Sequence, residues 1–151
     1  MSEHPSSEIA TVLQLAFGRC VPTTAIPLPV GMASHALAFA LDDPALPPRV
    51  MLRRYPPLHQ SRGFCAFTAQ QALRALNFPV PDVYYLGWSY HSRFLLLLSE
   101  YLDGRGTEGQ PHPFFARVGI SFAQTLAQLH GLHWSDLPDL PVKPRRFLLE
   151  S

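Results

Sequence analysis

Proline restricts this chain more than any other residue type. It fixes φ and has no backbone N–H group, so it is disfavoured inside helices and central strands. The sequence has 16 prolines in 151 residues, and most of them gather in short stretches. These stretches predict connections, and the regular elements have to fit around them. They lie at residues 22–29, 44–57, 79–81, 111–113 and 138–144.

Composition indicates one globular domain. Apolar residues make up 47% of the chain and charged residues 15%, a balance that differs from that of disordered chains. A chain of this length buries roughly 70% of the surface that its unfolded state exposes. The formal net charge is +1, which gives no electrostatic reason to expect binding to nucleic acid or to an acidic membrane.

The expected compartment is the cytoplasm. No apolar stretch approaches the roughly 20 residues of a membrane-spanning helix, and the opening Met-Ser-Glu-His-Pro lacks the order of a secretory signal. The two cysteines, Cys20 and Cys65, lie far apart in the sequence. This usage fits a reduced protein without a cysteine-based metal site. We therefore expect neither a membrane nor a nucleic acid as a partner.

Periodicity predicts an α+β fold. Apolar residues recur at helical spacing in residues 8–17, 64–76 and 115–131. Because one helix interrupts a series of hairpins, the sheet should be antiparallel. We expect five strands with one packed helix, an N-terminal helix and a C-terminal linking helix. The strand candidates are residues 26–30, which the prolines assign to a sheet edge, and Ala36–Leu41, Arg49–Tyr55, 82–88 and 92–102.

The last strand candidate has an unusual ending. Five apolar residues, Phe94 to Leu98, lead into Ser99-Glu100, and Asp103-Gly104 closes the segment as a turn. Such a run is typical of a strand buried on both faces, although periodicity alone does not separate it from a helix. A buried strand with a polar corner places main-chain groups beside apolar walls, which suits a planar heterocycle. The alternative is a core strand followed by a plain turn.

The element order and the words Ser99-Glu-Tyr-Leu-Asp-Gly104 resemble the N-terminal lobe of the aminoglycoside phosphotransferase family, relatives of choline kinase and the protein kinases. The resemblance spans about residues 26–132. It implies a protein-kinase-like N-lobe at 25–104 that binds ATP and ends in a hinge. An N-terminal helical extension (1–24) would precede this lobe. A linking helix and proline-rich tail (105–151) would begin a truncated C-lobe.

By this resemblance the hinge binds the adenine of ATP. The Ser99 carbonyl accepts a hydrogen bond from the adenine amino group, the Tyr101 amide donates one to the ring, and Glu100 lies between them. Each such bond contributes only about 1 kcal/mol net, so the apolar walls matter as much. Met51, on the third strand candidate, is the expected cover of the base.

The phosphate groups are assigned to a loop and an arginine. Val30-Gly-Met-Ala-Ser-His35 stands at the small-residue phosphate loop of the family, with Gly31, Ala33, Ser34 and His35 as the expected contacts. The alternative is a plain hairpin turn. Arg53 ends Val50-Met-Leu-Arg, where kinases have Val-Ala-Ile-Lys, and the resemblance implies that it grips the phosphates. The alternative is a solvated strand arginine.

Two further parts of the chain correspond to positions of the family. The glutamate that pairs with the phosphate-binding cation is expected at Ala69, and Gln70 or Gln71 is left to orient Arg53 by hydrogen bonding. His130 corresponds to the histidine that closes the linking helix and is expected to cap its C-terminus. A metal site at His130 and His133 is the less favoured alternative, because no carboxylate or cysteine pattern accompanies them.

The catalytic residues of the family are missing from these 151 residues. Phosphate transfer needs the aspartate of a His-Gly-Asp motif, with an Asn and an Asp for magnesium. After Leu132 the chain offers only Asp136 and Asp139, without those motifs. We therefore predict ATP binding without phosphate transfer, no catalytic residue and no metal ligand. Mg-ATP becomes the cofactor if the missing lobe is supplied, and whether the protein is an enzyme is left open.

Two other functions compete with this interpretation. The first is a non-catalytic, pseudokinase-type protein-interaction module, favoured by Ala69. The apolar stripe of the last helix (Phe115, Val118 and Phe122) would then bind a partner, which is a separate catalytic lobe or a second copy of the chain. The second is a small open sheet that binds an unrelated ligand. The phosphate acceptor is not specified by these residues.

Overall fold

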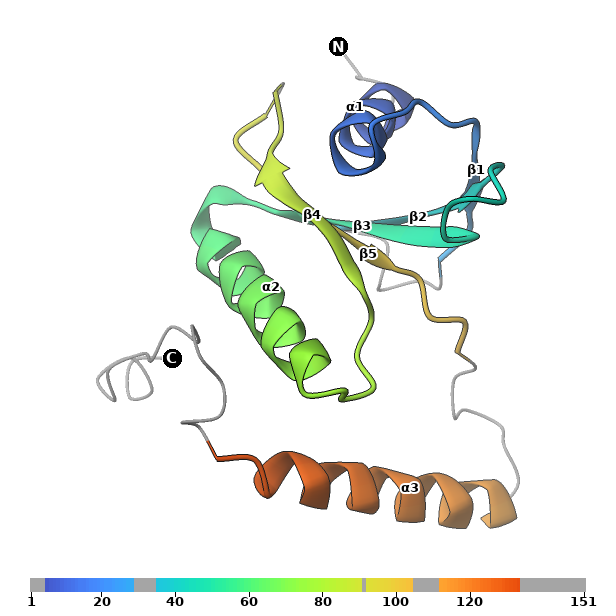
Figure 1. The fold of residues 1–151 in the computed structure, drawn as a ribbon, viewed down its shortest axis with the longest axis vertical. Coiled ribbons are helices and arrows are strands. Elements are labelled where there is room, and N and C mark those ends of the chain that lie inside the picture. Colours follow the sequence, from blue (N-terminus) through green and yellow to red (C-terminus); the bar gives the residue numbers. More distant parts are fainter. Residues whose placement is uncertain (1–4, 29–34, 91, 105–111, 134–151) are drawn as a thin grey trace. The chain divides into compact units, whose positions relative to one another are not determined.

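The computed structural model describes residues 5–28, 35–90, 92–104 and 112–133. The described residues up to Tyr101 form one compact unit, and those from Leu102 onwards form a second unit. The first unit is an antiparallel sheet with helices on both faces (Figure 1). The predicted α+β class with a five-stranded antiparallel sheet is therefore confirmed.

The sheet has the order β1-β2-β3-β5-β4, and all neighbours are antiparallel. The connection from β3 to the next strand, β4, passes through a short 3-10 helix, η1 (Pro57–His59), and α2 (Gln60–Ala75), and β5 then returns between β3 and β4. The strands are β1 (Thr23–Ile26), β2 (Ala36–Leu41), β3 (Arg49–Tyr55), β4 (Val83–Trp88) and β5 (Leu95–Glu100).

The first strand lies earlier than predicted. It was expected at residues 26–30, but β1 ends at Ile26, and Pro27 follows. Proline offers no N–H group for the ladder, so the pairing of β1 with β2 stops there. The expected position at a sheet edge is confirmed, since β1 pairs only with β2.

β5 is a buried interior strand of the sheet. Its residues Leu95 to Leu98 are at most 1% exposed, and β3 and β4 flank it on either side. Side chains alternate between the two faces of a strand, so Leu96 and Leu98 face one side and Leu95 and Leu97 the other. The prediction of a strand buried on both faces is confirmed.

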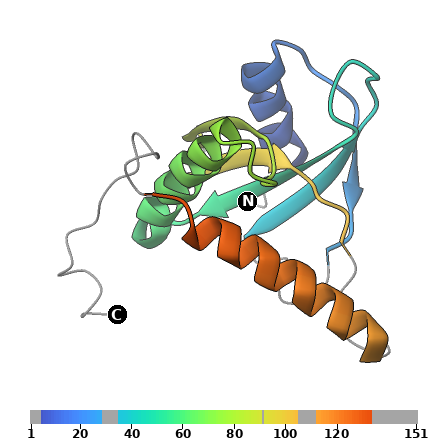
Figure 2. The same ribbon diagram turned by 60° about the horizontal axis from the view of Figure 1, so that its bottom comes forward.

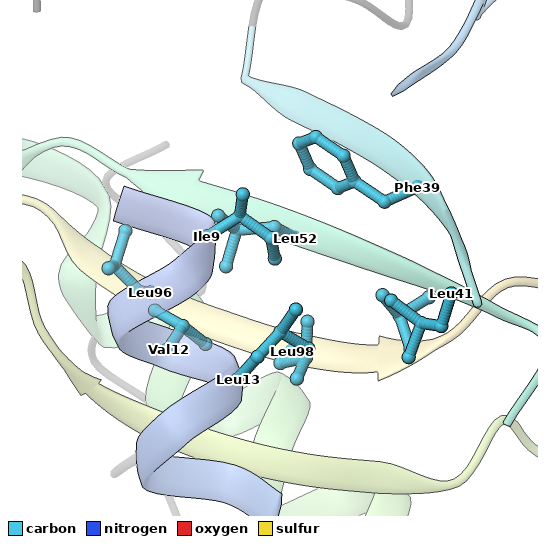
Figure 3. Packing of buried hydrophobic residues seen from close by; sticks show 9 residues of the cluster. Ile9, Val12, Leu13, Phe39, Leu41, Leu52, Leu96 and Leu98 are labelled. Atoms are coloured by element: carbon cyan, nitrogen blue, oxygen red, sulfur yellow. The ribbon is translucent and has the colours of Figure 1, made fainter. Parts of the chain in front are cut away.

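The N-terminal helix belongs to the core of the sheet. α1 (Pro5–Phe17) packs Ile9, Val12 and Leu13 on one face, and none of the three is more than 2% exposed (Figure 3). α1 lies in the N-terminal helical extension predicted at residues 1–24, and it contributes to the core because these side chains and the sheet share one hydrophobic cluster. The other members of that cluster are Phe39, Leu41, Val50, Leu52, Leu96 and Leu98.

The second helix covers part of the opposite face (Figures 1 and 2). α2 buries only Gly63, whose missing side chain allows the helix backbone to approach Tyr55 and Leu95. The helix ends at Ala75, and Asn77, just beyond its C-cap Leu76, has φ 57°. The Phe78 N–H donates to the Leu73 carbonyl (2.9 Å) and the Asn77 N–H to the Arg74 carbonyl (2.9 Å), which is a Schellman motif.

The second unit contains α3 (His112–His130), the predicted linking helix. The described side chains from Arg117 to His130 are exposed, and His130 lies in the last turn, as expected. Binding of a partner by this helix stays a prediction. None of the helices that the structure describes has both the length and the apolar character needed to cross a membrane.

Candidate anion-binding site

A basic pocket lies where β3 leads into α2. Its cavity volume is about 250 Å³, far above the roughly 10–15 Å³ that one water molecule needs. Ala36, Tyr55 and Pro56 form the uncharged part of its lining. The side chains that carry or can carry positive charge, which define the basic pocket, are His35, Arg53, Arg54, His59 and Arg62.

The local chain path brings these residues together. The Arg54 N–H donates to the His35 carbonyl (2.7 Å), which fixes His35 beside the end of β3. Pro56 then ends the strand, and the His59 N–H donates to the Pro56 carbonyl (2.8 Å) in the 3-10 turn. His59 and Arg62 are three residues apart at the start of α2, so they project from one side of the helix.

The pocket carries uncompensated positive charge. None of its lining residues is acidic, and the first turn of α2 has no acidic residue either. Within the described part of the chain, neither Arg53 nor Arg62 has an ion pair, and both are exposed. Anions are therefore attracted to this pocket, most strongly at low ionic strength.

Arg54 adds less positive charge to the basic pocket than its place in the lining suggests. Its side chain alternates with that of Arg53 and points to the α1 face. There Arg54 Nε lies 3.2 Å from Glu8 Oε2, an ion pair whose N–H direction does not make a hydrogen bond. The guanidinium also lies 4.9 Å from the centre of the Phe94 ring. Glu8 is held in turn by the Ser89 hydroxyl, which donates to Oε1 at 2.6 Å.

An apolar pocket adjoins the basic one. It lies along β1 and β2, has a cavity volume of about 130 Å³ and shares Ala36 with the basic pocket. The two cavities together provide a positively charged and an apolar surface side by side. The lining of the apolar pocket consists of Ala25, Ile26, Leu28, Ala36, Leu37, Ala38 and Phe39.

The predicted phosphate contacts are brought together only in part. His35 and Arg53 line the same pocket. The loop residues Gly31, Ala33 and Ser34 lie outside the described residues. Met51 is on the same sheet face as Arg53, because the two are two residues apart on β3, and it is 8% exposed.

The expected hinge is tied into the sheet. The Tyr101 N–H donates to the Arg49 carbonyl (3.3 Å), and the Glu100 N–H donates to the Asp82 carbonyl (2.8 Å). Ser99 is 4% exposed and pairs with Met51 and Val83 on its two sides. Donation from the Tyr101 amide to a bound base stays a prediction, and it would require this amide to leave the Arg49 carbonyl.

The glutamines of α2 do not orient Arg53. No hydrogen bond joins Gln70 or Gln71 to Arg53 in the part of the chain that the structure describes, and the buried Gln70 Oε1 has no hydrogen-bond partner there. The prediction that one of them orients this arginine is therefore wrong. Among the described residues, no group of three or more His, Cys, Asp or Glu side chains is placed to hold a metal ion.

His59 and Arg62 were missed from the sequence. The available signal was their spacing of three residues directly after the strand that carries Arg53. The turn through Pro56 places His59 and Arg62 in the same pocket as Arg53, and this turn is not apparent from their spacing.

No protein-family model, curated protein or solved structure matches the chain. Function therefore has to follow from the geometry and charge of the two pockets.

Proposed function

We propose that this chain binds a nucleotide of the ATP class, with its phosphate groups in the basic pocket. The observation that carries the proposal is that Arg53 and His35 line one cavity whose lining contains no carboxylate. Arginine binds phosphate through paired, charge-assisted hydrogen bonds. The position of α2 between β3 and β4 is compatible with the kinase-like lobe that the sequence resembles.

The register of the sheet supports a ligand with two chemically different parts. Ile26 is paired with Ala38, and Ala38 with Met51, so these three form an apolar row across one face. Ala36 and Arg53 form the next row on that face, two residues along the strands. Two residues correspond to about 7 Å. A nucleotide with its base near the first row would extend its phosphates toward the second.

The base would enter at the open end of the apolar row. Ala38 and Met51 are only 2% and 8% exposed, whereas Ile26 and Ala36 are half-buried and line the apolar pocket. We therefore expect the base to rest against Ile26 and Ala36. Weak binding follows, since the contact area is small and the Tyr101 amide is already bonded.

The chain alone would hold the nucleotide without turning it over. Arg53 and His35 would bind and orient the phosphates. The sequence of these 151 residues supplies no base for the acceptor hydroxyl and no aspartate–asparagine set for magnesium. Phosphate transfer would require those groups from elsewhere.

The test is a thermal melt and a calorimetric titration with Mg-ATP, ADP, AMP and inorganic tripolyphosphate. At ten times Kd, binding raises the free energy of unfolding by about 1.4 kcal/mol, which is readily visible as a higher Tm. Absence of any effect at about 10 mM Mg-ATP, a concentration that reveals even weak binding, would reject the proposal. If ATP binds no tighter than tripolyphosphate, the base makes no contact and the nucleotide assignment fails.

Arg53→Gln is the matching variant. Loss of its charge-assisted hydrogen bonds, worth about 1.5–3 kcal/mol, should weaken ATP binding by about tenfold or more. Arg19→Gln is the control, because it removes the same charge from an exposed arginine that pairs with Asp43 away from the basic pocket. Equal affinities of the two variants would show that Arg53 does not contact the phosphates.

A further inference from the structure

We infer that Arg62, with His59 beside it, forms a second anion-binding wall that makes the basic pocket selective for linked phosphate groups over a single phosphate. The inference rests on the proposed function, because it concerns the same site. It adds the residues that face Arg53 from α2 and the class of anion that both walls can bind together.

The two walls come from different elements. Arg53 and His35 belong to the strand side, from β3 and the residue before β2, whereas His59 and Arg62 belong to η1 and the first turn of α2. All four line one cavity. A ligand inside it therefore meets cationic or imidazole groups on both sides.

The charge on the α2 wall is available to a ligand. Arg54 is paired with Glu8, but Arg62 has no ion pair among the described residues, and the first turn of α2 adds no acidic side chain. Two guanidinium groups that line one cavity without a carboxylate repel each other, and a bound anion removes that repulsion. Relief of this repulsion favours contact between Arg62 and the ligand. The exposure of Arg62 alone would not favour that contact.

The size of the cavity favours a chain of phosphates. About 250 Å³ exceeds the space of one small ion, so the cavity has room for more than one phosphate group between its lining residues. Pyrophosphate or tripolyphosphate carries further charged groups that can reach Arg62 while the first stays on Arg53. Inorganic polyphosphate and the phosphate tail of a nucleotide share this chemistry.

The experiment is calorimetry with phosphate, pyrophosphate and tripolyphosphate at pH 7 and constant ionic strength. For the unmodified chain we expect affinity to rise at least tenfold from phosphate to tripolyphosphate. Arg62→Gln should lose at least tenfold for tripolyphosphate and change little for phosphate, so that the series becomes flat. Arg62→Lys should give an intermediate loss, because lysine keeps the charge but not the planar fork.

Arg19→Gln is again the control for net charge, and far-ultraviolet circular dichroism verifies that each variant is folded.

Two results would overturn the inference: equal tripolyphosphate affinity in Arg62→Gln and Arg19→Gln, or equal affinity of the unmodified chain for phosphate and tripolyphosphate. Its failure differs from that of the proposed function. Normal tripolyphosphate binding by Arg62→Gln, with impaired ATP binding by Arg53→Gln, rejects the second wall alone. If tripolyphosphate binds strongly and ATP binds no tighter, only the assignment of a nucleotide as the ligand is rejected.

Discussion

Leu13→Ala tests whether α1 is part of the folding unit. Leu13 is fully buried between α1 and the sheet (Figure 3). The change removes three carbon groups, worth about 2.4 kcal/mol at about 0.8 kcal/mol each, and leaves a cavity. We therefore expect a loss of about 3–4 kcal/mol. A unit of this size has a free energy of unfolding of about 5–15 kcal/mol, so the loss is a large part of the total.

The measurement is urea denaturation followed by far-ultraviolet circular dichroism, with the m-value as a check that the same surface unfolds. Leu15→Ala is the matched control: it makes the same chemical change on the same helix, at a side chain that is 49% exposed. That variant should lose less than about 1 kcal/mol. Equal losses in the two variants would show that α1 is not part of the folding unit of the sheet.

Two further predictions concern packing and pH. Gly63→Ala should lower the free energy of unfolding by about 1–2 kcal/mol in urea denaturation, because its Cβ would lie 2.8 Å from Leu95 Cδ2 and Tyr55 Cδ2. Gly119→Ala on α3, with nothing within 4 Å, should not lower it; the opposite ranking would refute the close approach. Burial, then the charges of Glu100 and Asp82, raise the pKa of Tyr84 to about 12 from 10.0. The neutral phenol therefore stabilises the fold fully below pH 10, and this contribution is lost as pH rises through 12. Urea denaturation between pH 10 and 12 should show a smaller decline for Tyr84→Phe than for the unmodified chain, and identical declines would contradict the assignment.

The strands that were easiest to predict have strong local signals. β2 and β3 agree with the predicted ranges, because each is an apolar or alternating run between turn residues. β1 was misplaced because Thr23–Ile26 carries little hydrophobic signal, while the apolar residues after it include Pro27. The pairing with β2 decides its position, and pairing is not visible in one segment.

Helix amphipathicity was predictable, but the assignment of helices to sheet faces was not. The spacing of Ile9, Val12 and Leu13 predicts a buried stripe in α1 without saying what buries it. α2 was expected to be the packed helix, yet only Gly63 is buried there. The size of the core on the α1 face depends on which side chains of β3 and β5 alternate toward it, which requires the sheet register.

The basic pocket was half predictable for the same reason. Arg53 followed from a strand motif and His35 from a loop position, and both motifs are continuous in the sequence. Arg62 and His59 reach the pocket only because the chain turns at Pro56 and starts α2 beside β3. The turn therefore determines how many cationic side chains line this pocket. A single cationic motif in the sequence does not indicate that number.

The ends of the sheet strands lead to a last prediction, about the choice of base. The sequence predicts the polar corner at Ser99. Which main-chain groups at that corner stay unbonded depends on how far the neighbouring strands extend. Arg49 still lies opposite Tyr101 and accepts its N–H. Breaking that bond costs about as much as a new bond to a base would return, roughly 1 kcal/mol, so main-chain recognition adds no net affinity.

Base affinity must then come from apolar contact with Ile26 and Ala36, which any planar base can make. We expect ATP, GTP and CTP to bind within about threefold of one another, a difference below 1 kcal/mol. Competition titrations measure this ratio directly. Ile26→Ala should weaken all three nucleotides alike and leave tripolyphosphate unaffected, while Leu102→Ala, an exposed apolar residue beyond the sheet, serves as the control. A preference for ATP over GTP and CTP of more than tenfold would contradict this expectation. It would mean that the hydrogen bond from the Tyr101 N–H to the Arg49 carbonyl opens on binding and that the hinge forms hydrogen bonds with the base.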